Sequence, residues 1–339
     1  MKNSSRNTTI DAMRLGAALL VVFVHSGNLI LAYQAETPMF LKPFLMLADA
    51  GDAIFMMISG YLLFLHPFQY GSMLKKKVRT ILVPLVLWNL IWILIDLVRL
   101  DLRGTASGIL TWPVSTWTIN LFGIPFHTAP FYMPFWFLTD LFGLILLSPL
   151  IRFLTKKTPF LAGAGIVILW FMPISYRIRI PFCFFLFGAL LAEYPQWKEK
   201  LKSIAEKISL PSALLCSLLV LVLPFSWYAL LDRITLILWI WPIGKLAETC
   251  MKNQKTASRI ELAASWNMFL YAVHGKAISY LQGVYTVQFA GSEGSIIAGY
   301  FGLALLSILF CWTAAAIVQH LLPRLYGVLS GGRGVPVHL

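Results

Sequence analysis

The chain has 339 residues, of which 59% are hydrophobic and 12% are charged. Soluble globular domains contain about 45–50% apolar and about 25% charged residues, so the composition excludes an ordinary soluble protein. It also excludes an intrinsically disordered chain, because so much apolar surface would not stay solvated. The composition predicts a polytopic integral membrane protein.

Ten apolar segments follow one another along the chain, most of them close to the ~20 residues that cross a bilayer as a helix. We therefore predict an all-α fold with about ten transmembrane helices. One membrane domain is expected over 1–339, with a helical bundle over 10–321 and a flexible tail over 322–339. The predicted spans are 10–33, 44–65, 80–98, 135–154, 160–175, 180–194, 209–228, 234–249, 262–283 and 295–321.

The basic residues predict the orientation of these spans. With the N-terminus inside, 19 of the 27 lysines and arginines fall on the inner side and six on the outer side. Such an excess is the pattern of cytoplasmic loops, so both termini are expected in the cytoplasm. The same rule explains the net charge of +13 without a nucleic-acid partner. The six outer residues are Lys42, Arg99, Arg103, Arg177, Arg179 and Arg233.

The first span carries three ionisable residues, Asp11, Arg14 and His25. Arg14 and His25 are eleven positions apart, which is three helical turns plus about 20°, so they share one face about 16 Å apart along the axis. Ionisable groups inside a membrane usually mark a functional site. The alternatives are an Arg14 that snorkels to the interface or pairs with Asp11, and a His25 that only bonds a neighbouring helix.

Further polar residues occur in later spans. Asp52 is expected at nearly the depth of His25, where a carboxylate would fix the histidine tautomer; alternatively it caps or pairs elsewhere. Ser59 precedes Gly60, which can simply permit close helix packing. Asp140 lies in the outer half of the fourth span, and His274 near mid-membrane is a proton relay, a ligand contact or a structural group.

Two segments between the predicted spans contain further candidate functional residues. The outer loop 99–134 is rich in aromatic residues and proline toward its end, and either caps a cavity or forms a passive aromatic belt. The run from Lys75 to Arg79 is expected at the cytoplasmic mouth. It can bind anionic lipid, fix the topology, or hold the phosphates of a nucleotide-type cofactor. The four scattered cysteines and the absence of an H-E-x-x-H motif predict no metal.

Several of these stretches resemble the membrane acyltransferase 3 family. That family has an arginine and, after ten intervening residues, a histidine in its first helix, as Arg14 and His25 are placed here. Residues 51–63 resemble its second-helix signature, with Met56 in place of the second aromatic residue. Lys76 and Arg79, followed by a proline, are similar to its R-x-x-R pattern, and 135–138 and 271–274 look like later landmarks.

The resemblance implies transfer of an acyl group, most often acetyl from acetyl-CoA, to a hydroxyl of a cell-surface carbohydrate. We expect such an enzyme in the bacterial cytoplasmic (inner) membrane, with lipid and a carbohydrate or other hydroxyl acceptor as its partners. Arg14, Lys76 and Arg79 are expected to hold the CoA phosphates, and His25 to act as general base with Asp52 orienting it. Four other residues are expected to line the substrate pocket: Ser59, Trp136, Asp140 and His274. The alternative is a transporter or exporter of a small polar solute or glycan that uses the same polar cavity.

Overall fold

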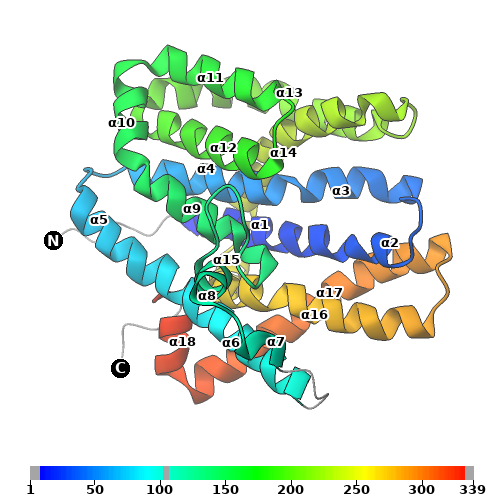
Figure 1. The fold of residues 1–339 in the computed structure, drawn as a ribbon. Helices are drawn as coiled ribbons and strands as arrows, with labels where there is room; N and C mark the ends of the chain where they lie inside the picture. The colour runs from blue at the N-terminus through cyan, green and yellow to red at the C-terminus, as the bar shows by residue number, and fades with distance from the viewer. Residues whose placement is uncertain (1–7, 102–106, 333–339) are drawn as a thin grey trace. The chain divides into compact units, whose positions relative to one another are not determined.

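The computed structural model describes residues 8–101 and 107–332, and the regular structure within these ranges is helical (Figure 1). Among these residues the one β feature is an isolated antiparallel bridge between Ile124 and Thr128. The predicted all-α class is therefore confirmed. Arg6 and Arg103, as well as positions 333–339 of the predicted tail, lie outside the described residues.

The helices follow in chain order, with short turns between several of them. Three of the turns are 3₁₀-helical (Met39–Leu41, Met133–Phe135 and Phe225–Trp227), and a π-helical turn spans Val78–Leu82. The α-helices are α1 (Thr8–Ser26), α2 (Asn28–Ala32), α3 (Lys42–Ala48), α4 (Ala50–Phe64), α5 (Tyr70–Lys77), α6 (Val83–Asp101), α7 (Ser107–Leu110), α8 (Val114–Phe122), α9 (Trp136–Leu146), α10 (Ser148–Lys157), α11 (Pro159–Phe171), α12 (Tyr176–Glu193), α13 (Pro195–Leu219), α14 (Tyr228–Met251), α15 (Gln254–Ser265), α16 (Asn267–Gln288), α17 (Glu293–Leu321) and α18 (Pro323–Leu329).

Several helical segments are long and apolar enough to cross a membrane. Within the described ranges there are five that qualify singly, and up to seven if two broken pairs each count as one span. The protein is thus an integral membrane protein, while ten spans and the cytoplasmic termini stay predictions. The single segments are Thr8–Ala32, Met39–Phe64, Tyr70–Arg99, Tyr228–Met251 and Glu293–Leu321, and the broken pairs are Met133–Leu146 with Ser148–Lys157 and Tyr176–Glu193 with Pro195–Leu219.

The seventh predicted span differs from the structure. It was expected over 209–228, but α13 begins at Pro195 and ends at Leu219. Proline fits the first turn of a helix, where its missing N–H has no partner to lose, so Pro195 starts the helix early. Pro224 then lies in the turn that follows, and the hydrophobic run continues through the 3₁₀ turn Phe225–Trp227 into α14, which begins at Tyr228.

The predicted flexible tail also needs correction, because positions 323–329 form α18. Tyr326 is fully buried, and the indole Nε1 of Trp88 donates a hydrogen bond of 3.1 Å to the carbonyl oxygen of Leu329. These contacts hold the segment against α6. The helix starts at Pro323 and ends just before Gly331, as proline and glycine commonly mark the two ends of a helix. The glycines that follow suggested a flexible segment, and the short helix before them was therefore not predicted.

The chain forms two compact units. The first contains positions up to Ile58 and Tyr194–Ile317. In it α1 packs against α3, α14, α15 and α16. At Gly51 the α4 backbone approaches α1 so closely that a Cβ atom would lie 2.8 Å from the carbonyl oxygen of Ala17. A small residue is needed there, as is common between membrane helices.

The second unit contains Ser59–Glu193 and positions from Val318 onward. Here α12 packs against α9, α10 and α11, and α6 packs against α8 and α18. Figure 1 shows α11 and α12 side by side. A Cβ at Gly60 would overlap the carbonyl oxygen of Phe185, so this glycine lets α4 pack directly on α12.

Candidate functional site

The predicted polar face of the first span lies on one uninterrupted helix. Because α1 runs without a break from Thr8 to Ser26, Arg14 and His25 are on the same face, about 16 Å apart along the axis. Both side chains are partly buried in the first unit.

The first unit brings His25 together with His274, two histidines from opposite ends of the sequence. Their ring centroids are 4.9 Å apart and the rings are inclined by 56°. His274 is fully buried on α16, whereas His25 keeps some exposed surface. Two imidazolium charges at this distance would repel each other strongly in a membrane interior, so at most one of the two rings can be charged at a time.

The hydrogen bonds of His274 define which of its nitrogens is basic. Nδ1 lies 3.0 Å from the carbonyl oxygen of Leu270 and 2.9 Å from that of Tyr271. Carbonyl oxygens only accept, so Nδ1 carries the proton and donates it to this pair of acceptors. In the neutral ring Nε2 is therefore the basic nitrogen, and the orientation of the ring is set by its own helix.

Asp52 lies lower in the bundle than the sequence predicts. Gly51 meets α1 between Ala17 and Val21, and Gly27 meets Leu45. These two contacts fix the antiparallel register and place Asp52 about 10 Å inward of His25 at 1.5 Å per residue. The expected equal depth fails because the second helical segment begins at Met39 and not at the predicted position 44, so Asp52 lies farther from the outer end of its segment.

Asp52 lies near other acidic residues that are distant in the sequence, and this proximity was not predicted. Asp49 lies within electrostatic range of Asp52 and of Asp232 on α14, and Tyr228 within range of Asp49 and Asp232. Tyr300 on α17 also lies within electrostatic range of Asp49. The acidic group therefore joins α4, α14 and α17 in the first unit.

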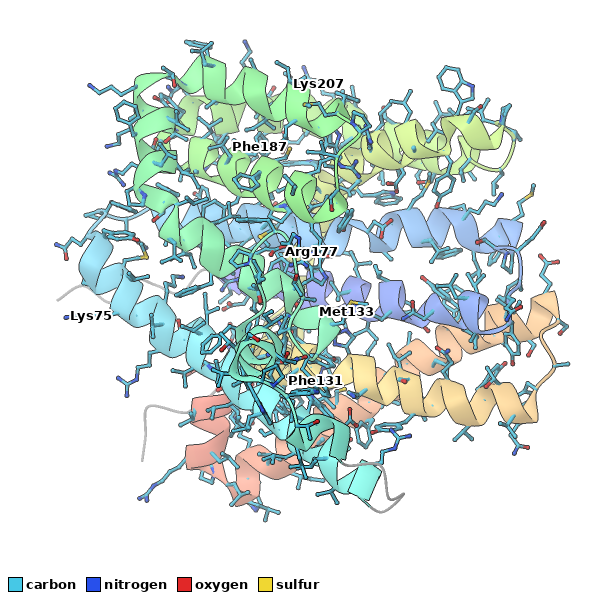
Figure 2. The ribbon with its side chains drawn as sticks, in the orientation of Figure 1. Lys75, Phe131, Met133, Arg177, Phe187 and Lys207 are labelled. Atoms are coloured by element: carbon cyan, nitrogen blue, oxygen red, sulfur yellow. The ribbon has the colours of Figure 1, made fainter. Side chains whose placement is uncertain are left out.

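In the second unit Asp140 is fully buried and anchors the outer loop. Its carboxylate accepts a hydrogen bond of 2.6 Å from the backbone N–H of Phe126 and pairs with Nη2 of Arg177 at 2.8 Å. Arg177, labelled in Figure 2, also donates to the carbonyl oxygen of His127 and lies over the ring of Trp136 at 5.6 Å. Asp140 and Trp136 are thus brought together, with Arg177 as a partner that the sequence did not suggest.

A buried asparagine anchors the two ends of the same loop. The side-chain amide of Asn89 on α6 donates to the carbonyl oxygen of Leu121 at 3.1 Å, and its oxygen accepts from the N–H of Tyr132 at 2.9 Å. Gly123 and Phe126 between them have positive φ angles of 69° and 62°. The end of the aromatic loop is therefore anchored on α6 and α9 within its unit, while a cavity beneath it stays a prediction.

The remaining predicted residues lie at two places in the second unit. Ser59 is half-buried beside Gly60, so the close packing of Gly60 on Phe185 accounts for that part of the motif. Lys76 is exposed at the end of α5, and Arg79 is exposed in the π-helical turn. Arg79 also lines a cavity of about 1010 Å³. Arg14, the third residue expected to bind phosphate, is in the first unit.

No cluster of three or more His, Cys, Asp or Glu side chains that could hold a metal ion occurs in the part of the chain that the structure describes. The residues missed by sequence reasoning are Asn89, Arg177, Asp232 and Arg324. Asn89, Arg177 and Asp232 act with groups far away in the sequence, and Arg324 lines a cavity together with Arg79. Only the unusual presence of a polar residue in an apolar run could have drawn attention to Asn89 and Asp232.

Comparisons with known proteins agree with the resemblance in the sequence. A family described as an acyltransferase domain, acyltransferase 3, matches residues 7–316. The succinoglycan biosynthesis protein ExoH of Rhizobium meliloti (strain 1021) is 30% identical over 168 residues, which cover 44% of this chain and 43% of that protein. No solved structure matches the chain. Because the family match extends over nearly all of the sequence, the chain belongs to the acyltransferase 3 family.

Proposed function

We propose that the protein transfers an acetyl group from acyl-CoA to a hydroxyl of a carbohydrate-type acceptor outside the cytoplasm. The observation that carries the proposal is the His25–His274 pair inside a membrane acyltransferase. The name of the relative, a succinoglycan biosynthesis protein, supports a carbohydrate acceptor. The bacterial inner membrane is the proposed location, because the cytoplasm supplies acyl-CoA there.

The chemistry needs a base for the acceptor hydroxyl. We assign this role to His25, whose exposed surface lets a substrate reach it while His274 is enclosed. His25 takes the hydroxyl proton as the oxygen attacks the thioester carbonyl carbon, and a tetrahedral intermediate forms. When the intermediate collapses, the C–S bond breaks and the CoA sulfur takes the proton from His25. The products are the acyl ester and free CoA.

Two residues are proposed to support His25 without contacting the reacting atoms. His274 limits the ring positions of His25 and, through its basic Nε2, its protonation. Asp52 lies between the depths of Arg14 and His25, where its charge favours a proton on the histidine pair. Donor binding is assigned to Arg14, Lys76 and Arg79, and contact with acceptor or acyl group to Ser59 and Trp136. Asp140 is proposed to act by fixing the outer loop through Phe126 and Arg177.

The test measures acyl transfer per folded molecule with acetyl-CoA in membranes that carry the protein. His25→Ala should lower the rate about 10²- to 10⁴-fold, the usual contribution of a general base. Binding of acetyl-CoA should persist, because the phosphate-binding end of α1 is about 16 Å away. His320→Ala is the matched control, since that histidine is exposed near the end of α17. Near-normal transfer by His25→Ala would exclude His25 as the base.

The acceptor is tested separately. Mass analysis of surface glycans from cells with and without the gene should show one acyl-group mass difference on a sugar, and His25→Ala should give the pattern of the deletion. An unchanged glycan profile would refute a carbohydrate acceptor. If membranes that carry the protein transport a solute but neither hydrolyse acetyl-CoA nor transfer its acyl group, the alternative function of a transporter would be favoured.

A further inference from the structure

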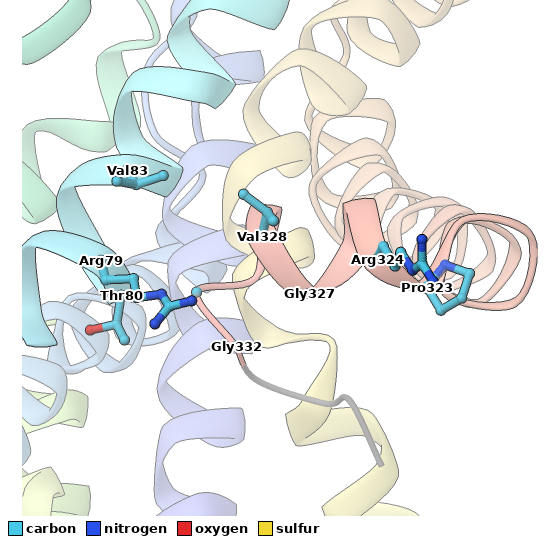
Figure 3. A pocket seen from close by; sticks show the side chains of 9 residues that line it. Arg79, Thr80, Val83, Pro323, Arg324, Gly327, Val328 and Gly332 are labelled. Carbon is cyan, nitrogen blue, oxygen red and sulfur yellow. The ribbon is translucent and has the colours of Figure 1, made fainter. Parts of the chain in front are cut away.

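The second unit contains a cavity of about 1010 Å³ between the π-helical turn before α6 and the C-terminal segment that holds α18 (Figure 3). Arg79 and Thr80 line it from the turn, and Arg324, Val328 and the Gly331–Gly332 pair line it from the C-terminal segment. Its volume is at the upper end of the roughly 300–1,000 Å³ of small-molecule sites. It is large enough for a nucleotide-bearing ligand.

The charge of this cavity comes from two guanidinium groups. Arg79 and Arg324 are both exposed, and no ion pair joins either of them to another described residue. Figure 3 shows the side chain of Arg79 extended toward the segment that leads to Gly332, while Arg324 lies at the far end of α18. Arginine is well suited to phosphate because its planar fork can donate two hydrogen bonds to one group. Two separated arginines fit a ligand with two separated phosphate-bearing groups.

The C-terminal wall of the cavity is held in place by several contacts. Trp88 donates to the carbonyl oxygen of Leu329, and Tyr326 is fully buried. Gly331 has φ of +66°, and a Cβ there would collide with the carbonyl oxygen of Thr80. The segment can approach the π-helical turn this closely only because position 331 has no side chain.

This wall lies beyond the part of the chain that matches the acyltransferase family, which ends at residue 316. We infer that the C-terminal segment completes the donor site, with Arg79 binding the diphosphate and Arg324 the ribose 3′-phosphate of CoA. The inference rests on the acyl-CoA donor of the proposed function. Arg79 is given the diphosphate because its helical segment, Tyr70–Arg99, continues as a membrane span, along which the thioester arm must run.

The first test compares CoA with dephospho-CoA, which lacks only the 3′-phosphate, as ligands of the full-length protein in lipid nanodiscs. Loss of one charge-assisted hydrogen-bonding partner should weaken binding about 10- to 100-fold. Arg324→Gln should weaken CoA by this factor and leave dephospho-CoA unchanged, so that the two ligands bind alike. Arg79→Gln should weaken both. Lys157→Gln, an exposed charge on α10 outside the cavity, is the control and should change neither.

The second test uses the adjacent glycines. Gly331 and Gly332 both have left-handed backbone, with φ of +66° and +79°, but only Gly331 abuts Thr80, while a Cβ at Gly332 meets nothing within 4 Å. Gly331→Ala and Gly332→Ala therefore add similar backbone strain, and only the former displaces the wall. CoA affinity should fall more in Gly331→Ala, with thermal melting of both proteins showing that they remain folded.

The outcomes separate this inference from the proposed function. If the unmodified protein binds neither CoA nor acetyl-CoA, the donor in the proposed function is wrong and the inference falls with it. If it binds CoA but Arg324→Gln keeps the original preference over dephospho-CoA, only the role of Arg324 is refuted. Equal effects of the two alanine substitutions would likewise show that the wall does not shape the site.

Discussion

The ion pair between Asp140 and Arg177 predicts an asymmetric response to mutation. The Asp140 side chain is 0% exposed, whereas that of Arg177 is 20% exposed. Arg177→Met would leave a buried carboxylate with the Phe126 N–H as its remaining known donor, and an uncompensated buried charge costs about 3–5 kcal/mol. Asp140→Asn would leave an arginine that can reach water and still donate to His127, at a cost of about 1–2 kcal/mol.

Thermal melting of the purified full-length protein, followed by tryptophan fluorescence, measures this asymmetry. We expect the order unmodified protein, Asp140→Asn, Arg177→Met in decreasing Tm. The double variant Asp140→Asn/Arg177→Met should have a higher Tm than Arg177→Met alone, because it contains no buried and unpaired carboxylate. Lys207→Met, an exposed charge on α13, should stay within about 0.5 kcal/mol of the unmodified protein.

Two results would refute this reasoning. Equal losses from the two single substitutions would mean that exposure does not decide the cost. A double variant less stable than Arg177→Met would mean that the pair stabilises the fold by its attraction and not by neutralising a buried carboxylate. Protease cleavage within the outer loop should rise in the same order as Tm falls, since Phe126 and His127 are the points at which the pair holds that loop.

Three further predictions use other parts of the chain. Single cysteines at Lys156 and Ser292 should react with a membrane-impermeant reagent only from the cytoplasmic and the outer side, respectively; the opposite result would invert the topology. Gly60→Val should lower folded yield sharply, whereas Gly165→Val, where a side chain meets nothing within 4 Å, should not. Asn89→Ala should lower stability by about 1–3 kcal/mol, because two backbone groups of the loop lose their partners; unchanged melting would remove its anchoring role.

Hydropathy predicted the helical class and the positions of most apolar helices, because a helix that crosses the lipid bilayer requires a long run of apolar residues. It could not predict where helices break. Val78–Leu82 forms a π-helical turn, and α9 and α10 meet at an angle of 61° around Leu147. Val78–Leu82 follows three lysines and contains Arg79, and Pro149 lies just after Leu147, so hydropathy alone marks neither position. The angle between α9 and α10 depends on what packs against them, which a single sequence does not record.

The candidate site was predicted residue by residue but not as an arrangement. His25 and His274 each stood out as ionisable groups in apolar runs, yet nothing in the sequence indicates that their rings meet. Asp140 stood out in the same way and proved to hold a loop through Arg177. A polar residue within an apolar run indicates that a hydrogen-bond or ion-pair partner must be present in the membrane. Only the fold shows whether that partner is a backbone group, another side chain or a substrate.

The ion pair that holds the outer loop also sets a problem for synthesis of the protein. Arg177 follows Asp140 by 37 residues, so at about 5–20 residues per second it leaves the ribosome roughly 2 to 7 s later. During that interval α9 presents a carboxylate without Arg177, and an aspartate costs up to about 2.5–3.5 kcal/mol in a membrane helix, the full amount only at its centre. Stable insertion of α9 therefore has to await α12, and ribosomes stalled between these helices should carry an α9 that is still accessible to water.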